Sequence, residues 1–277
     1  MSTTGPLGLV GGRADDRLVS DDEVAAGLPQ EQVVAKWQEI APGIDKMAER
    51  IQDPNDFPKR PGSSLSGDDQ KSSPYCVSHA ARMCLAGGVD HLHAAKSLVL
   101  DLQVLHADAV YSLVRGSLEN LAAAFWILHP SLRNNRIERT LRWHARNFNE
   151  QRIALEPLGL ADETTCEAKL AKLDSVATSR GISTANVRAG YRSSTAVKYV
   201  EEHSSDSAPL LPWQLCSGFA HGRPWAILGM SEREQYETTD PGVLNLRLTS
   251  DLSRVLYPTL SAFRLMAEVV RLLDQRS

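Results

Sequence analysis

The chain has 277 residues, of which 42% are hydrophobic, so it can bury a large core without disulfide bonds to hold it together. Its four cysteines are scattered and form no C-x-x-C pair, which argues against a disulfide framework and indicates reduced thiols in the cytoplasm. No segment approaches the roughly 20 apolar residues that cross a bilayer, and the acidic N-terminus does not resemble a signal peptide, so no membrane association is expected.

The N-terminal quarter of the chain divides into three predicted segments. Residues 1–20 show no apolar period and are predicted to be a flexible tail. Residues 21–52 carry apolar side chains at spacings of three and four, which predicts an amphipathic helix. Residues 53–74 contain four prolines, two glycines and five serines, and this composition predicts a linker or long surface loop.

Residues 75–277 are predicted to form the main helical domain. Glycine and proline interrupt a nearly continuous helical pattern, and the pair Gly87-Gly88 is expected to break it. Turn residues between Met230 and Leu248 predict a small β-hairpin. The expected fold is therefore all-α, a helical bundle with at most one small hairpin. The predicted helices span residues 75–86, 89–106, 108–128, 132–156, 162–179, 194–203, 210–221 and 250–275.

The segment from Val110 to Leu128 is apolar on nearly every side and yet contains Arg115 and Glu119. These two side chains lie one helical turn apart, so they share a face and can pair. One interpretation is a buried or half-buried ion pair that organises the bundle. The other is that the pair lines a polar pocket, where it serves catalysis or ligand binding.

The predicted helix at 132–156 carries a basic stripe, because its arginines recur at steps of three and four. One interpretation is a solvated face that acidic neighbours neutralise. The other is contact with RNA phosphates, because a guanidinium can donate two hydrogen bonds at once. The body around the stripe is near neutral, with 21 acidic and 22 basic side chains in residues 75–277, so no DNA binding is expected. The arginines of the stripe are Arg133, Arg136, Arg139, Arg142 and Arg146.

The segment WQLCSGFAHGRPW, residues 213–225, holds a further pair of candidate residues. Ser217 and His221 lie one turn apart, so the hydroxyl and the imidazole project to the same side. Gly222 is expected to end the helix and to leave His221 at its C-terminus, where a histidine can act as acid or base near neutral pH. The alternative is a structural pair, because nucleophilic catalysis also needs an orienting acid and an oxyanion site.

No metal or cofactor site is predicted. Cysteine and histidine side chains cluster between Cys76 and His93, but His91 and His93 cannot share one face of a helix, which argues against a preformed zinc site. The sequence contains no glycine-rich phosphate loop, H-E-x-x-H motif or dinucleotide fingerprint.

Two strings, LVRGSLENLAAAFWILHPSLRNNRIERTLR and WQLCSGFAHGRPWA, resemble uncharacterised helical proteins common in actinobacteria and their phages. Those proteins are distantly similar to the higher eukaryotes and prokaryotes nucleotide-binding (HEPN-like) superfamily. The resemblance implies RNA or nucleotide binding, or a metal-independent ribonuclease, in toxin–antitoxin or phage-defence systems. The superfamily's active site pairs a histidine with an arginine four to six residues upstream. Here Gln214, Leu215 and Cys216 precede His221 without an arginine, so Arg115 or Arg223 would have to take that role in space.

These observations lead to two hypotheses about function. The first is a polar pocket that binds RNA or a nucleotide, in which His221 is an acid or base and Glu119 orients an arginine. The second is a non-enzymatic interaction protein that dimerises through the final helix, 250–275. The pocket hypothesis names His221, Ser217 and Glu119 as catalytic residues. Its ligand-binding residues are Arg115, Arg136, Arg139 and Arg223.

Overall fold

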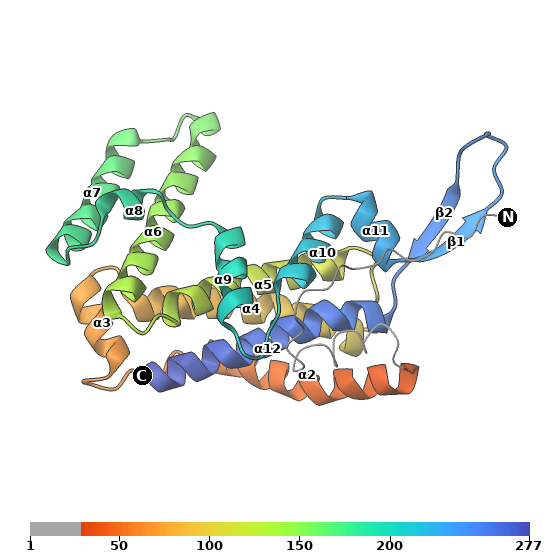
Figure 1. Ribbon diagram of the computed structural model, residues 1–277, viewed down its shortest axis with the longest axis horizontal. Helices are drawn as coiled ribbons and strands as arrows, with labels where there is room; N and C mark the ends of the chain where they lie inside the picture. Colours follow the sequence, from red (N-terminus) through yellow and green to blue (C-terminus); the bar gives the residue numbers. More distant parts are fainter. Residues whose placement is uncertain (1–28) are drawn as a thin grey trace.

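The computed structural model describes residues 29–277, which form a helical bundle with one two-stranded antiparallel sheet (Figure 1). This confirms the predicted all-α fold with a small hairpin, whereas the predicted tail at 1–20 lies outside the described residues. A π-helical turn at Ser97–Asp101 and a 3-10 turn at Glu156–Leu158 complete the regular structure. The α-helices are α2 (Gln30–Gln52), α3 (Ser64–Ser72), α4 (Val77–Lys96), α5 (Ala109–Leu128), α6 (Arg133–Leu155), α7 (Glu163–Ser179), α8 (Thr184–Arg188), α9 (Ser193–His203), α10 (Leu210–Ala220), α11 (Pro224–Met230) and α12 (Leu252–Arg276).

Helix α5 lies at the centre of the bundle and packs against α4, α12, α10 and α9. Every residue from Leu121 to Leu128 is buried, as the apolar composition of this helix requires. Helices α2, α4, α5 and α12 run lengthwise through the molecule (Figure 1). Neither α5 nor any other helix within residues 29–277 is long and apolar enough to cross a bilayer.

Helix α2 shows the predicted amphipathic pattern from Gln30 onward, while residues 21–28 lie outside the described range. It packs on α4 and α12. Trp37 is fully buried, and its indole Nε1 donates a hydrogen bond to the carbonyl oxygen of Leu252 at 3.1 Å. The helix therefore belongs to the same core as α12. Its buried side chains are Val33, Trp37, Ile40, Ile44 and Met47.

The predicted linker at 53–74 is wrong for its second half, because residues 64–72 form α3. Ser63 caps this helix by accepting a hydrogen bond from the Ser66 amide at 3.1 Å. The inward face of α3 buries Asp68, which is 0% exposed. Charged side chains are seldom buried without a partner, and the partner here is on α6, where Arg136 Nε donates to Asp68 at 2.6 Å. The polar composition of this segment predicted a loop, but the segment forms a helix that packs on α6.

The predicted break at Gly87-Gly88 is also wrong, because α4 runs without interruption from Val77 to Lys96. A Cβ atom at Gly88 would lie 2.6 Å from Cγ of Leu121 on α5. The missing side chain allows the two helices to approach closely, which compensates for the low helix propensity of glycine. The predicted helix at 89–106 ends early, and the π-helical turn follows Lys96.

Two elements project from opposite ends of the bundle (Figure 1). Helices α6, α7 and α8 pack against one another at one end. The strands β1 (Glu232–Tyr236) and β2 (Asn245–Thr249) form the hairpin at the other end, with Glu232 paired to Thr249 and Tyr236 to Asn245. Between these projections lie α5 and α10, which carry the candidate residues Arg115, Glu119 and Ser217.

We expect the α3–α6 ion pair to be required for stability. Replacement of Asp68 with alanine leaves the buried Arg136 guanidinium without its carboxylate, which should lower the free energy of unfolding by about 3–5 kcal/mol. The control is Glu150→Ala, which removes an ion pair with Arg146 whose side chains are 50% and 56% exposed and should cost at most about 1 kcal/mol. Urea unfolding measures both, and equal losses would contradict the assignment.

Candidate functional site

Arg115, Glu119, Trp213 and His221 meet at the surface of the bundle, and we call this group the Arg115 cluster. Arg115 Nε donates to Glu119 Oε1 at 3.1 Å, and Arg115 Nη1 lies 3.3 Å from His221 Nε2. Trp213 Nε1 donates to the same oxygen of Glu119 at 2.9 Å. Three residues of the predicted pocket are thus brought together, two from α5 and His221 from the end of α10.

Local packing explains why these residues converge. Arg115 and Glu119 share one face of α5 because they lie four residues apart. The rings of Tyr111 on α5 and Phe219 on α10 stack with centroids 3.8 Å apart and planes 6° apart, which holds the end of α10 against α5. Helix α10 ends at Ala220, and His221 follows it directly. The stack thereby places the imidazole next to Arg115.

The ends of α10 and α11 complete this surface. Gly222 has φ +60°, a left-handed conformation that suits glycine, and it terminates α10 as the sequence predicted. A Cβ atom at Gly218 would lie 2.3 Å from Cβ of Ala226, so α11 packs closely on α10. Arg223 is exposed, and Trp225 is 56% exposed. An arginine and an indole therefore stand on the surface beyond His221.

The contact between Arg115 and His221 determines the hydrogen-bonding role of His221 Nε2. A guanidinium can only donate hydrogen bonds, so His221 Nε2 is the acceptor in this contact. A proton transfer through this nitrogen would first have to break the contact. The arrangement therefore suits binding better than acid or base catalysis through Nε2.

Ser217 does not take the predicted catalytic position. Within residues 29–277, no hydrogen bond joins its hydroxyl to the His221 ring, and the described link is between the His221 amide and the Ser217 carbonyl oxygen at 3.1 Å. The neighbouring Cys216 is no substitute as a nucleophile, because burial raises the pKa of its thiol and keeps it protonated.

Arg136 is not part of the cluster, in contrast to the prediction. Its side chain is 2% exposed, and five hydrogen bonds use all its N–H groups. Two of these bonds reach Asp68, and one reaches Ser64 on α3. The other two reach the carbonyl oxygens of Pro130 and Ser131. No donor remains for a ligand, so Arg136 is a structural residue.

Arg139 also lies elsewhere. Its Nη1 donates to the carbonyl oxygen of Trp126 at 2.6 Å, and its guanidinium lies 4.0 Å from the centroid of the Tyr199 ring. Trp126 is eleven residues from Arg115 along α5, which corresponds to about 16 Å at 1.5 Å per residue. The predicted ligand-binding role of Arg139 in this pocket is therefore not supported, and its contacts join α5, α6 and α9.

Trp213 is the residue of the cluster that sequence analysis missed. Its indole and the Arg115 guanidinium both donate to Glu119, so the carboxylate fixes the position of both groups. The spacing contained a usable signal, because Trp213 and His221 lie eight residues apart, about two helical turns, and therefore on one face.

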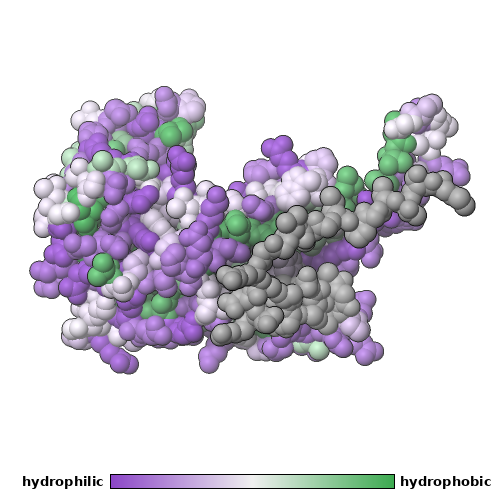
Figure 2. Space-filling view, in the orientation of Figure 1, coloured by the Kyte–Doolittle hydropathy of each residue, from purple (hydrophilic) through white to green (hydrophobic). Residues whose placement is uncertain are grey.

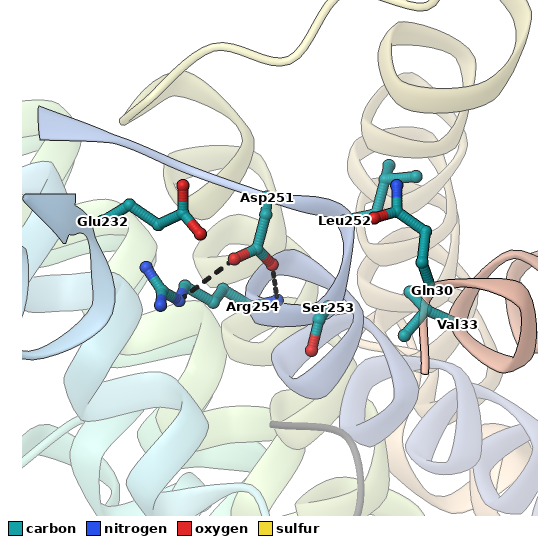
Figure 3. A pocket seen from close by; sticks show the side chains of 7 residues that line it. All are labelled: Gln30, Val33, Glu232, Asp251, Leu252, Ser253 and Arg254. Atoms are coloured by element: carbon teal, nitrogen blue, oxygen red, sulfur yellow. Dashed lines mark hydrogen bonds and ion pairs between the residues drawn. The ribbon is translucent and has the colours of Figure 1, made fainter. Parts of the chain in front are cut away.

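A separate hollow of 290 Å³ lies between the start of α2 and the start of α12 (Figure 3). Asp251 there accepts the Arg254 amide at 2.8 Å and pairs with the Arg254 Nε at 3.2 Å. These contacts cap α12, and no predicted site residue lines the hollow. Across residues 29–277 there is also no group of three or more His, Cys, Asp or Glu side chains suited to a metal ion.

The basic helix α6 contains a histidine that titrates far from its usual range. Burial lowers the pKa of His144 from 6.5 to about 4, because its ring packs among Tyr75, Trp143 and Phe148. The unfolded chain binds a proton at this position near pH 6.5, whereas the folded chain does so only near pH 4. Stability is therefore lost as the pH falls through this interval.

We expect His144→Phe to remove this pH dependence. Between pH 7 and pH 4 the wild-type protein should lose up to about 3 kcal/mol more free energy of unfolding than the variant, at about 1.4 kcal/mol per pKa unit. The phenyl ring should keep the aromatic packing, and other titrating groups affect both proteins alike. Urea unfolding at several pH values measures the difference, and parallel profiles would refute the assignment.

The structure thus unites Arg115, Glu119 and His221, adds Trp213, and leaves Arg223 on the adjoining surface. It places Arg136 and Arg139 in contacts that hold helices together. Comparison with known proteins found no matching family model, curated protein or solved structure.

Proposed function

We propose that the Arg115 cluster binds a phosphate group of RNA or of a nucleotide. The observation that carries this proposal is the incomplete use of the Arg115 guanidinium. A guanidinium has five N–H donors, and two of them are used by Glu119 and His221. The other three have no described partner within residues 29–277, and the Arg115 side chain is 27% exposed. These donors are available to a phosphate.

The contacts of Arg115 also prepare it for binding. Glu119 and His221 hold the guanidinium from two sides, so little side-chain freedom remains to be lost when a ligand binds. Glu119 is itself held by Trp213. The carboxylate therefore acts as a positioning residue, and the phosphate would contact the opposite edge of the guanidinium.

The adjoining surface favours a single-stranded ligand. Arg223 offers a second guanidinium to the backbone, and the exposed indole of Trp225 can stack on a base. The phosphate contacts predict an affinity that falls as the salt concentration rises. Stacking on one indole predicts little discrimination between bases.

The test is binding of a fluorescently labelled oligouridine, measured by anisotropy at low and moderate salt. Arg115→Ala should weaken binding at least tenfold, because hydrogen bonds to charged groups contribute about 1.5–3 kcal/mol. Arg115→Lys should restore only part of the affinity, since an ammonium lacks the planar fork. His221→Ala should also weaken binding while the melting temperature stays nearly unchanged.

The matched control is Arg152→Ala, which removes the same charge. Arg152 has a side-chain exposure of 28% and pairs with Glu163 at 3.3 Å, so its setting resembles that of Arg115. Equal losses in Arg115→Ala and Arg152→Ala would show non-specific attraction and would overturn the proposal. Failure of the wild-type protein to bind RNA and nucleotides alike would do the same.

The second candidate function is a non-enzymatic interaction protein, and exposed apolar residues on the hairpin favour it. Val243 and Leu244 are 51% and 65% exposed, and Figure 2 shows hydrophobic residues on this projection. Such exposed residues can mark contact surfaces. The apolar face of α12, expected to mediate dimerisation, is instead packed on α2, α4 and α5 in the same chain. A dimer would have to use another surface.

Sedimentation equilibrium tests this second candidate. A dimer held by the hairpin should dissociate at least tenfold more readily when Leu244 is replaced by aspartate, because the carboxylate would lose water at the contact. The control is Leu158→Asp, at a residue that is 68% exposed after α6. A wild-type protein that stays monomeric at high concentration would rule out this dimer.

A further inference from the structure

A second cavity, besides the hollow at Asp251, lies between α2, the π-helical turn and the start of α12. Its lining is mostly apolar, in contrast to the charged Arg115 cluster. Its volume is 510 Å³, which falls within the range of small-molecule sites, about 300–1,000 Å³. Among residues 29–277, no ionisable side chain lines it. The apolar lining consists of Val34, Trp37, Val99, Leu100, Leu105 and Leu252.

The wall formed by the π-helical turn is tied firmly to α2. Lys96, which is 6% exposed, pairs with Asp45 on α2 at 2.8 Å and with Asp101 at 2.9 Å. The chain then folds back, with the Val104 amide donating to the Leu98 carbonyl oxygen at 2.8 Å. Lys96, Asp45 and Asp101 are therefore paired with one another, and none of them lines the cavity. These contacts hold the wall in place without a ligand.

Gln103 shows that this wall is under conformational strain. It has φ +53°, a left-handed conformation that costs a non-glycine residue about 1–2 kcal/mol. Strained residues and π-helical turns are both frequent at functional sites. The π-helical turn and Gln103, which follow one another in the chain, thus both adjoin the same cavity.

The polar groups of the cavity are two amides. Gln38 on α2 and Gln103 on the opposite wall both line it, and both residues are exposed. Neither side chain has a described hydrogen bond within residues 29–277. Each amide can donate to a carbonyl oxygen or accept from an N–H group. A charged ligand would find no counter-charge here and would lose its hydration without compensation.

We infer that this cavity binds an uncharged, mostly apolar small molecule that carries a carbonyl or amide group. Its apolar part contacts the aliphatic and indole wall, and its polar group bonds to the Gln38 or Gln103 amide. The site is separate from the Arg115 cluster, so the inference does not depend on RNA or nucleotide binding.

The experiment uses Prodan, an uncharged naphthalene ketone whose fluorescence rises in apolar surroundings. The full chain should bind one molecule of Prodan, and Leu105→Trp should weaken binding at least tenfold because the indole fills the cavity. Val34→Trp fills it from the opposite wall and should have the same effect, which guards against a folding defect in one variant. Circular dichroism verifies that each variant is folded.

Three further comparisons test whether binding is specific to the cavity. Leu132→Trp adds an indole at a position that is 65% exposed between α5 and α6, and it should leave Prodan binding unchanged. Gln103→Gly keeps the left-handed backbone and removes one amide, so it should weaken Prodan binding several-fold. Anilinonaphthalene sulfonate, which is charged, should bind at least tenfold more weakly than Prodan. Absence of Prodan binding to the wild-type chain, or equal binding by both cavity-filling variants and Leu132→Trp, would overturn the inference.

Discussion

The burial of α5 on nearly every side is the constraint on which the rest of the structure depends. Within residues 29–277, five helices contact it, α4, α6, α9, α10 and α12. Such a helix can carry charged groups readily only where its neighbours leave access to water. Arg115 and Glu119 occupy such an edge, beside the end of α10. The location of the candidate site is therefore a consequence of core packing, because the same contacts that bury the helix leave this edge open.

Arg115 and Arg136 show how one residue type takes two roles. Both guanidinium groups pair with a carboxylate, but five bonds surround Arg136, whereas Arg115 has two. A saturated, buried guanidinium holds α3 to α6 and is costly to disturb. An unsaturated one at the surface retains donors for a ligand. Local sequence does not separate the two cases, since both arginines lie on helices with acidic residues near them.

The Arg115 cluster and the apolar cavity are formed by different parts of the fold. The cluster needs the contact between α5 and α10, whereas the cavity needs α2, the π-helical turn and the start of α12. One site offers hydrogen-bond donors with a positive charge, and the other offers an uncharged wall with two amides. The ligands that we propose for the two sites are therefore chemically distinct, and each site can be altered without the other.

The sequence by itself determined the features that depend on local periodicity. It predicted the amphipathic α2, the long α12, the hairpin and the pairing of Arg115 with Glu119, because each arises within one helix or one turn. Only the tertiary structure decided the continuity of α4 at Gly88, the burial of Asp68 on α3 and the approach of His221 to Arg115. Arg115 and His221 are 106 positions apart in the chain. Their contact depends on the stacking of Tyr111 on Phe219, and such distant packing leaves no periodic signal in the sequence.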